Sequence, residues 1–123
     1  MTTRTNSMEN QKPNYTLEKI KAFADSDAES LRLILNSLVQ SSRQNLELFR
    51  QHLQQCDEQA LTELAHKMLP LFKQLEAREV VTLLSQLEEG RLTRLERESL
   101  SRNAIVQIEA LLSTLVAEQS LED

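Results

Sequence analysis

Residues 61–75 read LTELAHKMLPLFKQL, and this stretch decides the fold. If it forms a helix, with about 100° of rotation per residue, its apolar side chains fall on one side. That side consists of Leu61, Leu64, Ala65, Met68, Phe72 and Leu75. The opposite side carries Thr62, His66, Leu69, Pro70 and Lys73. The spacing therefore predicts an amphipathic helix with a core face and an outer face.

Two helices are predicted before this stretch. A short helix follows Thr16 and has apolar residues at Leu17, Ile20, Phe23 and Ala24. Ser26 and Glu29 match a capping box, in which the two side chains satisfy N–H groups at a helix start. We expect a long helix from there, with apolar positions at Leu31, Ile34, Leu35, Leu38, Leu46, Phe49 and Leu53.

Two more helices are predicted after it. Asp57, at the break Cys56-Asp57, is a plausible N-cap for the helix that contains His66. After a pause at residues 76–78, a fourth helix has apolar residues at Val80, Leu83, Leu84 and Leu87. Gly90 can end it in the left-handed conformation. Thr93 and Glu96 form a second capping box, which opens a fifth helix with inward residues Leu100, Ala104, Ile108, Leu111 and Leu115.

The composition favours the same class. The 123 residues include one Gly and two Pro, and strong helix formers fill the rest. Short connections favour antiparallel neighbours. We predict an all-α fold, an antiparallel up-and-down four-helix bundle with a short additional N-terminal helix, over residues 15–119. Residues 1–14 are polar and are predicted to be a disordered tail or linker.

Charge and residue counts exclude several functions. The net charge is −5 and no cluster of basic residues offsets it, so a nucleic-acid partner is not expected. A single cysteine, Cys56, allows no disulfide framework and fits a reducing cytoplasm. His52 and His66 lie on different helices without carboxylates at ligand spacing, so no metal site is expected. No apolar run approaches the roughly 20 residues that span a bilayer, so direct membrane insertion is not expected.

Position alone leaves His66 open to two interpretations. An exposed helical histidine is commonly an ordinary surface residue. Leu69, which the projection places one turn later on the outer face, would make the surface partly apolar, as a docking surface is. Pro70 removes a helical hydrogen bond to the His66 carbonyl and either kinks the helix to follow the bundle or opens the surface to a partner. Thr62, Leu69 and Pro70 are the predicted docking residues. His52 lies at the edge of the apolar stripe of the second helix, where nothing indicates chemistry. The acidic pair Glu88 and Glu89 and the charged run 91–98 are interpreted as a solvated helix end and face.

The residues Ala65, His66 and Met68 resemble the signature of histidine-containing phosphotransfer domains, written A-H-x-L-K-G. The resemblance covers about residues 15 to 118 and extends to the order of helices. Residues 65–75 resemble the versions found with bacterial hybrid sensor histidine kinases, in which Pro replaces the glycine. The chain departs from the family pattern at Leu69, where a lysine is usual, and at Pro70.

The resemblance implies a role in phosphorelay signal transduction. His66 would accept a phosphoryl group from a receiver-domain aspartate and pass it to another, with Lys67 or Lys73 replacing the missing lysine beside the phosphoryl group. The chain would be a phosphocarrier without autokinase activity, since it has no nucleotide-binding motif. Its partners would be response-regulator receiver domains and a hybrid sensor histidine kinase. Mg²⁺ is expected on the receiver only, and the chain is expected to be cytoplasmic, alone or within a membrane-anchored kinase.

Two other functions are compatible with the sequence. The chain could be a non-phosphorylated helical adaptor that binds a receiver or kinase domain through the face of Leu69 and Pro70. It could also be a structural bundle that dimerises through an apolar face. Labelling of His66 by a phosphorylated receiver separates the first hypothesis from both.

Overall fold

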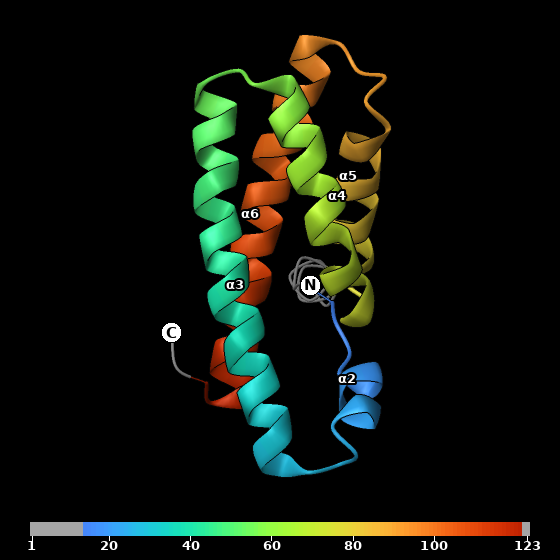
Figure 1. Ribbon diagram of the computed structural model, residues 1–123, viewed down its shortest axis with the longest axis vertical. Helices are drawn as coiled ribbons and strands as arrows, with labels where there is room; N and C mark the ends of the chain where they lie inside the picture. The colour runs from blue at the N-terminus through green and yellow to red at the C-terminus, as the bar shows by residue number, and fades with distance from the viewer. Residues whose placement is uncertain (1–13, 122–123) are drawn as a thin grey trace, which may run out of the picture.

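The computed structural model describes residues 14–121, which contain five helices and no strand (Figure 1). The helices are α2 (Glu18–Phe23), α3 (Ala28–Gln54), α4 (Glu58–Gln74), α5 (Arg78–Glu89) and α6 (Arg94–Gln119). The predicted all-α class is thus confirmed. The predicted tail, residues 1–14, lies outside the described residues except for Asn14, which is exposed.

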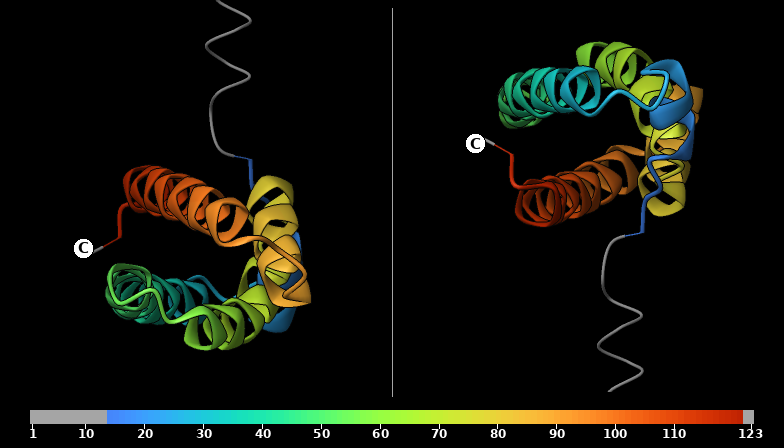
Figure 2. Two further views of the ribbon diagram at one scale, coloured as in Figure 1. Left: turned by 90° about the horizontal axis from the view of Figure 1, so that it is seen from above. Right: turned by 90° about the horizontal axis from the view of Figure 1, so that it is seen from below.

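Helices α3, α4, α5 and α6 surround one hydrophobic core. Each packs against its neighbour in the chain, and α3 also contacts α6. The end views in Figure 2 show the four helices arranged around the bundle in chain order. All six residues of the predicted inner stripe of α4 are buried, and so are the four of α5. Phe49 and Phe72 are fully enclosed and are the largest side chains in the core. The apolar spacing therefore identified the inward-facing residues of α4 and α5 correctly.

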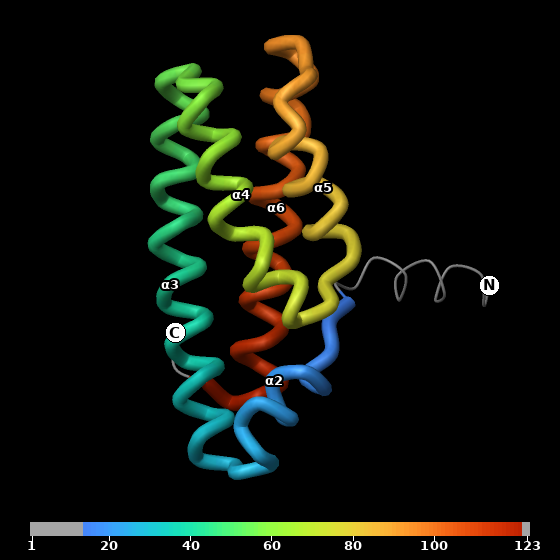
Figure 3. Tube along the Cα trace, turned by 45° about the vertical axis from the view of Figure 1, so that its right-hand side comes forward, coloured from blue at the N-terminus to red at the C-terminus, as the bar shows by residue number. Residues whose placement is uncertain are grey.

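Helix α2 lies near the C-terminal end of α4 (Figure 3). Ile20 packs into the core, and the Thr16 N–H donates to the Leu75 carbonyl at 2.7 Å. The Tyr15 hydroxyl donates to Glu118 of α6 at 2.5 Å, and burial together with this hydrogen bond raises the pKa of Tyr15. Phe23, predicted to be on the apolar face, is 85% exposed, because the six-residue helix rests on the core through a single residue, Ile20.

Side chains cap three helix starts. Asp57 accepts from the Ala60 N–H at 3.1 Å, and Thr93 forms the full predicted capping box with Glu96. The capping box predicted from Ser26 is wrong. Helix α3 begins one residue later, because Asp27 takes the N-cap position and accepts from the Ser30 N–H at 2.9 Å.

Helix ends in this chain use left-handed residues that are mostly not glycine. Gly90 has φ +76° and ends α5 as predicted. Cys56 and Glu76 take φ +56° and +52° directly after α3 and α4. The ends of α3 and α4 are each closed by the two backbone hydrogen bonds of a Schellman motif, such as Ala77 N–H to the Phe72 carbonyl at 3.1 Å. A chain with one glycine thus places other residues in a conformation that costs them about 1 kcal/mol or more.

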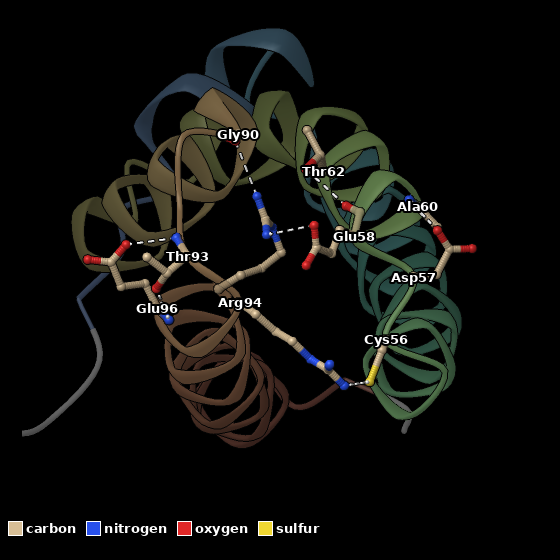
Figure 4. Close-up of polar contacts among 10 residues, drawn as sticks. Cys56, Asp57, Glu58, Ala60, Thr62, Gly90, Thr93, Arg94 and Glu96 are labelled. Carbon is tan, nitrogen blue, oxygen red and sulfur yellow. Dashed lines mark hydrogen bonds and ion pairs between the residues drawn. The ribbon is translucent and has the colours of Figure 1, made fainter.

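Arg97 closes one end of the bundle from within α6. Its side chain donates to the Gly90 carbonyl at 3.2 Å and pairs with Glu58 of α4 at 3.2 Å. Beside it, Arg94 donates to the Cys56 sulfur at 3.0 Å (Figure 4). Arg97 is only 5% exposed, so the interpretation of residues 91–98 as a wholly solvated run is wrong at this position. The buried guanidinium links α4, the loop after α5 and α6.

Candidate functional site

His66 lies in the middle of α4 on its outer face, as the helical projection predicts. Its side chain is 73% exposed. The preceding residue, Ala65, is fully buried in the core and so anchors the backbone at this point. The imidazole is therefore presented to solvent by a rigid helix.

Glu88 of α5 contacts the imidazole of His66. Its carboxylate oxygen Oε2 meets ring atom Nδ1, and the Glu88 side chain is 33% exposed. Because an ionised carboxylate only accepts hydrogen bonds, Nδ1 carries the hydrogen in this pair. In the neutral ring, the other nitrogen, Nε2, then holds the lone pair.

Sequence reasoning missed Glu88, which it assigned to a solvated helix end. The two residues are 22 positions apart and on different helices. Only the extensive packing of α4 on α5 brings them together. One feature of the sequence could have indicated the contact. Glu88 follows the core residue Leu87 and so lies at the border of the buried face of α5.

Leu69 does not lie on the outer surface, which corrects the prediction. It is 6% exposed and belongs to the hydrophobic core. Leu69 is about 60° around the helix from His66, on the side toward the core stripe. Because α4 has α3 on one flank and α5 on the other, its buried face is wider than the stripe of one isolated helix. The Leu69 side chain is therefore not available for docking in this structure.

The other two predicted docking residues remain near the surface. Pro70 is exposed, and α4 continues through it from Glu58 to Gln74, so the proline does not end the helix. A proline within a helix costs about 3 kcal/mol through the lost hydrogen bond and the ring clash. Thr62 is half-buried, and its hydroxyl donates to the Glu58 carbonyl at 3.1 Å. Its hydroxyl hydrogen is thereby used within its own helix.

Two lysines lie on α4 beyond His66. Lys67 and Lys73 are both exposed. Lys73 is in the last turn of α4, seven residues after His66, and so lies nearly in line with it along the helix. Lys67 is about 100° around the helix from His66. Lys73 therefore shares the face of His66 but lies about 10 Å farther along the axis, whereas Lys67 is adjacent in sequence and points to another side of the helix.

Other chemistry-bearing side chains lie away from His66. His52 is half-buried near the end of α3, and its Nδ1 is buried without a hydrogen-bond partner among residues 14–121. A surface groove of about 520 Å³ between α3 and α6 is lined by Arg50, Leu53, Gln54, Arg102, Ile105 and Val106. Within the described part of the chain, no group of three or more His, Cys, Asp or Glu side chains could hold a metal ion. None of the helices described is both long enough and apolar enough to cross a bilayer.

Comparison with known proteins gives no relative for this chain. No protein-family model, no curated protein and no solved structure matches it. The geometry around His66 and the motif that contains it are therefore the basis for proposing a function.

Proposed function

We propose that the chain is a phosphorelay carrier of the histidine-containing phosphotransfer type, with His66 as the phosphoryl acceptor. The observation that carries this proposal is the exposed imidazole whose Nδ1 is held by Glu88. In this arrangement the nucleophilic nitrogen Nε2 of His66 is directed away from Glu88. The finer architecture that we infer is an antiparallel up-and-down four-helix bundle, with α2 as the short additional helix.

In the acceptance step, the imidazole of His66 forms the new bond and Glu88 is its carboxylate partner. Nε2 attacks the phosphorus of an aspartyl phosphate, the N–P bond forms, and the P–O bond to the aspartate breaks, releasing the carboxylate. The hydrogen on Nδ1 stays in place, so the ring becomes a phosphorylated imidazolium. Glu88 lies beside the positive charge that develops and stabilises it through a charge-assisted hydrogen bond.

The return step benefits from the same contact. An aspartate of a second receiver attacks the phosphorus, the N–P bond breaks, and a neutral imidazole with its hydrogen on Nδ1 leaves. Because the leaving ring is neutral rather than anionic, no separate acid is needed on this chain. We propose receiver domains and a hybrid sensor histidine kinase as partners, with Mg²⁺ supplied by the receiver and a phosphocarrier role without autokinase activity for the chain.

Lys73 is the proposed counter-charge for the phosphoryl group, with Lys67 as the second candidate. Both are exposed and flexible enough to move toward a group on Nε2. Surface ion pairs of this kind contribute little in isolation, so we expect modest effects when either lysine is replaced.

Transfer from a phosphorylated receiver tests the proposal. A panel of isolated receiver domains is phosphorylated with radiolabelled acetyl phosphate in the presence of Mg²⁺, and each is mixed with the full chain. We expect at least one receiver to label the chain, and the His66→Gln variant to take up no label.

The second histidine provides a matched control. The His52→Gln variant should accept label at the wild-type rate, because His52 is on another helix and half-buried. Undiminished labelling of His66→Gln, or failure of the whole panel to label the wild-type chain, would contradict the proposal.

The adaptor function remains the alternative. The exposed Pro70 and half-buried Thr62 beside His66 would suit a protein partner without any phosphoryl transfer. Sedimentation with the same receivers separates the two functions. Stable binding with no phosphohistidine would favour the adaptor.

A further inference from the structure

Pro70 leaves an unpaired acceptor next to the proposed nucleophile. It stands four residues after His66 within the continuous helix α4. Proline has no backbone N–H, so the helical hydrogen bond to the His66 carbonyl cannot form. The backbone of the proposed phosphoryl acceptor therefore carries an acceptor oxygen without its helical donor.

This oxygen lies on the same outer face as the imidazole. His66 and Pro70 are both exposed, whereas Met68 and Leu69 between them are buried. In a helix the side chains tilt toward the N-terminus while the carbonyls point toward the C-terminus. The imidazole and the freed carbonyl thus follow one another along the axis of α4.

Several helix ends of the chain have hydrogen-bond partners for their backbone groups. Asp57 and Thr93 cap two helix starts with side-chain oxygens, and paired backbone hydrogen bonds close α3 and α4. A mid-helix proline beside the candidate nucleophile departs from that pattern. Local strain of this kind is concentrated at functional sites, where it persists because the surrounding structure enforces it.

We propose that the His66 carbonyl oxygen accepts a hydrogen bond from an N–H or O–H donor on the docking surface of the receiver domain. Pro70 acts as a positioning residue that keeps this oxygen available. The inference rests on the proposed phosphorelay function and identifies one backbone contact through which the receiver is held against His66.

The test compares two residues at position 70 that differ in a single group. Pro70→Ala restores the N–H and with it the internal helical bond. Lactic acid at position 70, introduced as an ester analogue of alanine, has the same methyl side chain but no N–H. The receiver that labels the wild-type chain fastest is used as the phosphodonor, and the apparent KM and kcat for labelling of His66 are measured.

We expect the alanine variant to have an apparent KM about threefold to tenfold higher than the ester variant, the effect of one hydrogen bond, with kcat unchanged. The ester variant should keep a KM close to that of the wild-type chain. Alanine should also raise the melting temperature above that of the ester variant, because it restores the helical bond.

Equal KM values for the alanine and ester variants would overturn the inference, whether both match the wild type or both are raised, since the ring itself would then be the contact. Equal melting temperatures would also overturn it, because the His66 carbonyl would not be gaining a bond. Both outcomes require a wild-type chain that is labelled, so they are distinct from failure of the phosphorelay proposal.

Discussion

Two polar side-chain pairs of α4 lie in different surroundings. His66 pairs with Glu88 of α5 at the surface, where the two side chains are 73% and 33% exposed. Glu58 pairs with Arg97 of α6 at one end of the bundle, where the Arg97 side chain is 7% exposed and the Glu58 side chain 52% exposed. An exposed pair is screened by water and contributes little to stability, whereas removing the buried Arg97 side chain also deletes its packed apolar stem. The first pair is therefore suited to adjusting chemistry, and the second to holding the fold.

The burial of Leu69, one helical turn from the exposed His66, can be tested by substitution. We expect Leu69→Ala to lower the free energy of unfolding by about 3 kcal/mol, because it leaves a cavity in the core. Urea unfolding followed by circular dichroism measures the loss. Leu95→Ala, at a position 76% exposed, is the matched control and should change stability little. If both substitutions had equal, small effects on the free energy of unfolding, the Leu69 side chain would not be buried in the core.

Replacing the buried Arg97 is expected to have the next largest effect. Arg97→Ala should lower the free energy of unfolding by about 2 kcal/mol, because the Gly90 carbonyl and Glu58 lose their partner and the buried stem is removed. The same denaturation experiment applies. Arg94→Ala removes the neighbouring exposed arginine and should have a much smaller effect. A loss no larger for Arg97 than for Arg94 would show that burial does not distinguish them.

The exposed pair should affect rate rather than stability. We expect Glu88→Ala to lower the rate constant for phosphorylation of His66 about tenfold, which corresponds to one charge-assisted hydrogen bond. Its free energy of unfolding should change by less than about 1 kcal/mol. Rapid-quench labelling and urea unfolding measure the two quantities. A wild-type rate in this variant would mean that Glu88 has no part in positioning the ring.

The smallest effect is expected at a helix end remote from both pairs. Glu76 has φ +52°, which glycine adopts without strain. Glu76→Gly should raise the free energy of unfolding by about 0.5–1 kcal/mol and leave the labelling rate unchanged. A destabilised variant would show that the Glu76 side chain contributes more than its backbone strain costs.

Much of the fold could be predicted from local patterns. The apolar spacing of α4 and α5 and the caps at Asp57 and Thr93 are properties of consecutive residues, and all were predicted correctly. The wrong N-cap predicted at Ser26 also has a local cause, because the adjacent Asp27 is the N-cap of α3.

The site was predictable only in part. The exposure of His66 follows from the helical projection of its own helix. The burial of Leu69 and the contact of Glu88 do not, because both depend on where α5 lies against α4. Arg97 was missed for a similar reason, since its partners Gly90 and Glu58 come from other segments. Residue patterns identify faces of helices, whereas pairs across helices require the packed structure.

The nitrogen atom that carries the phosphoryl group distinguishes the proposed arrangement of His66 and Glu88 from any other. The chain, with ¹⁵N-labelled histidine, is phosphorylated by its receiver and examined by phosphorus–nitrogen correlation NMR. We expect a single phosphorylated nitrogen, Nε2 of His66, because Nδ1 is hydrogen-bonded to Glu88. A phosphoryl group on Nδ1 of His66, or on His52, would contradict it.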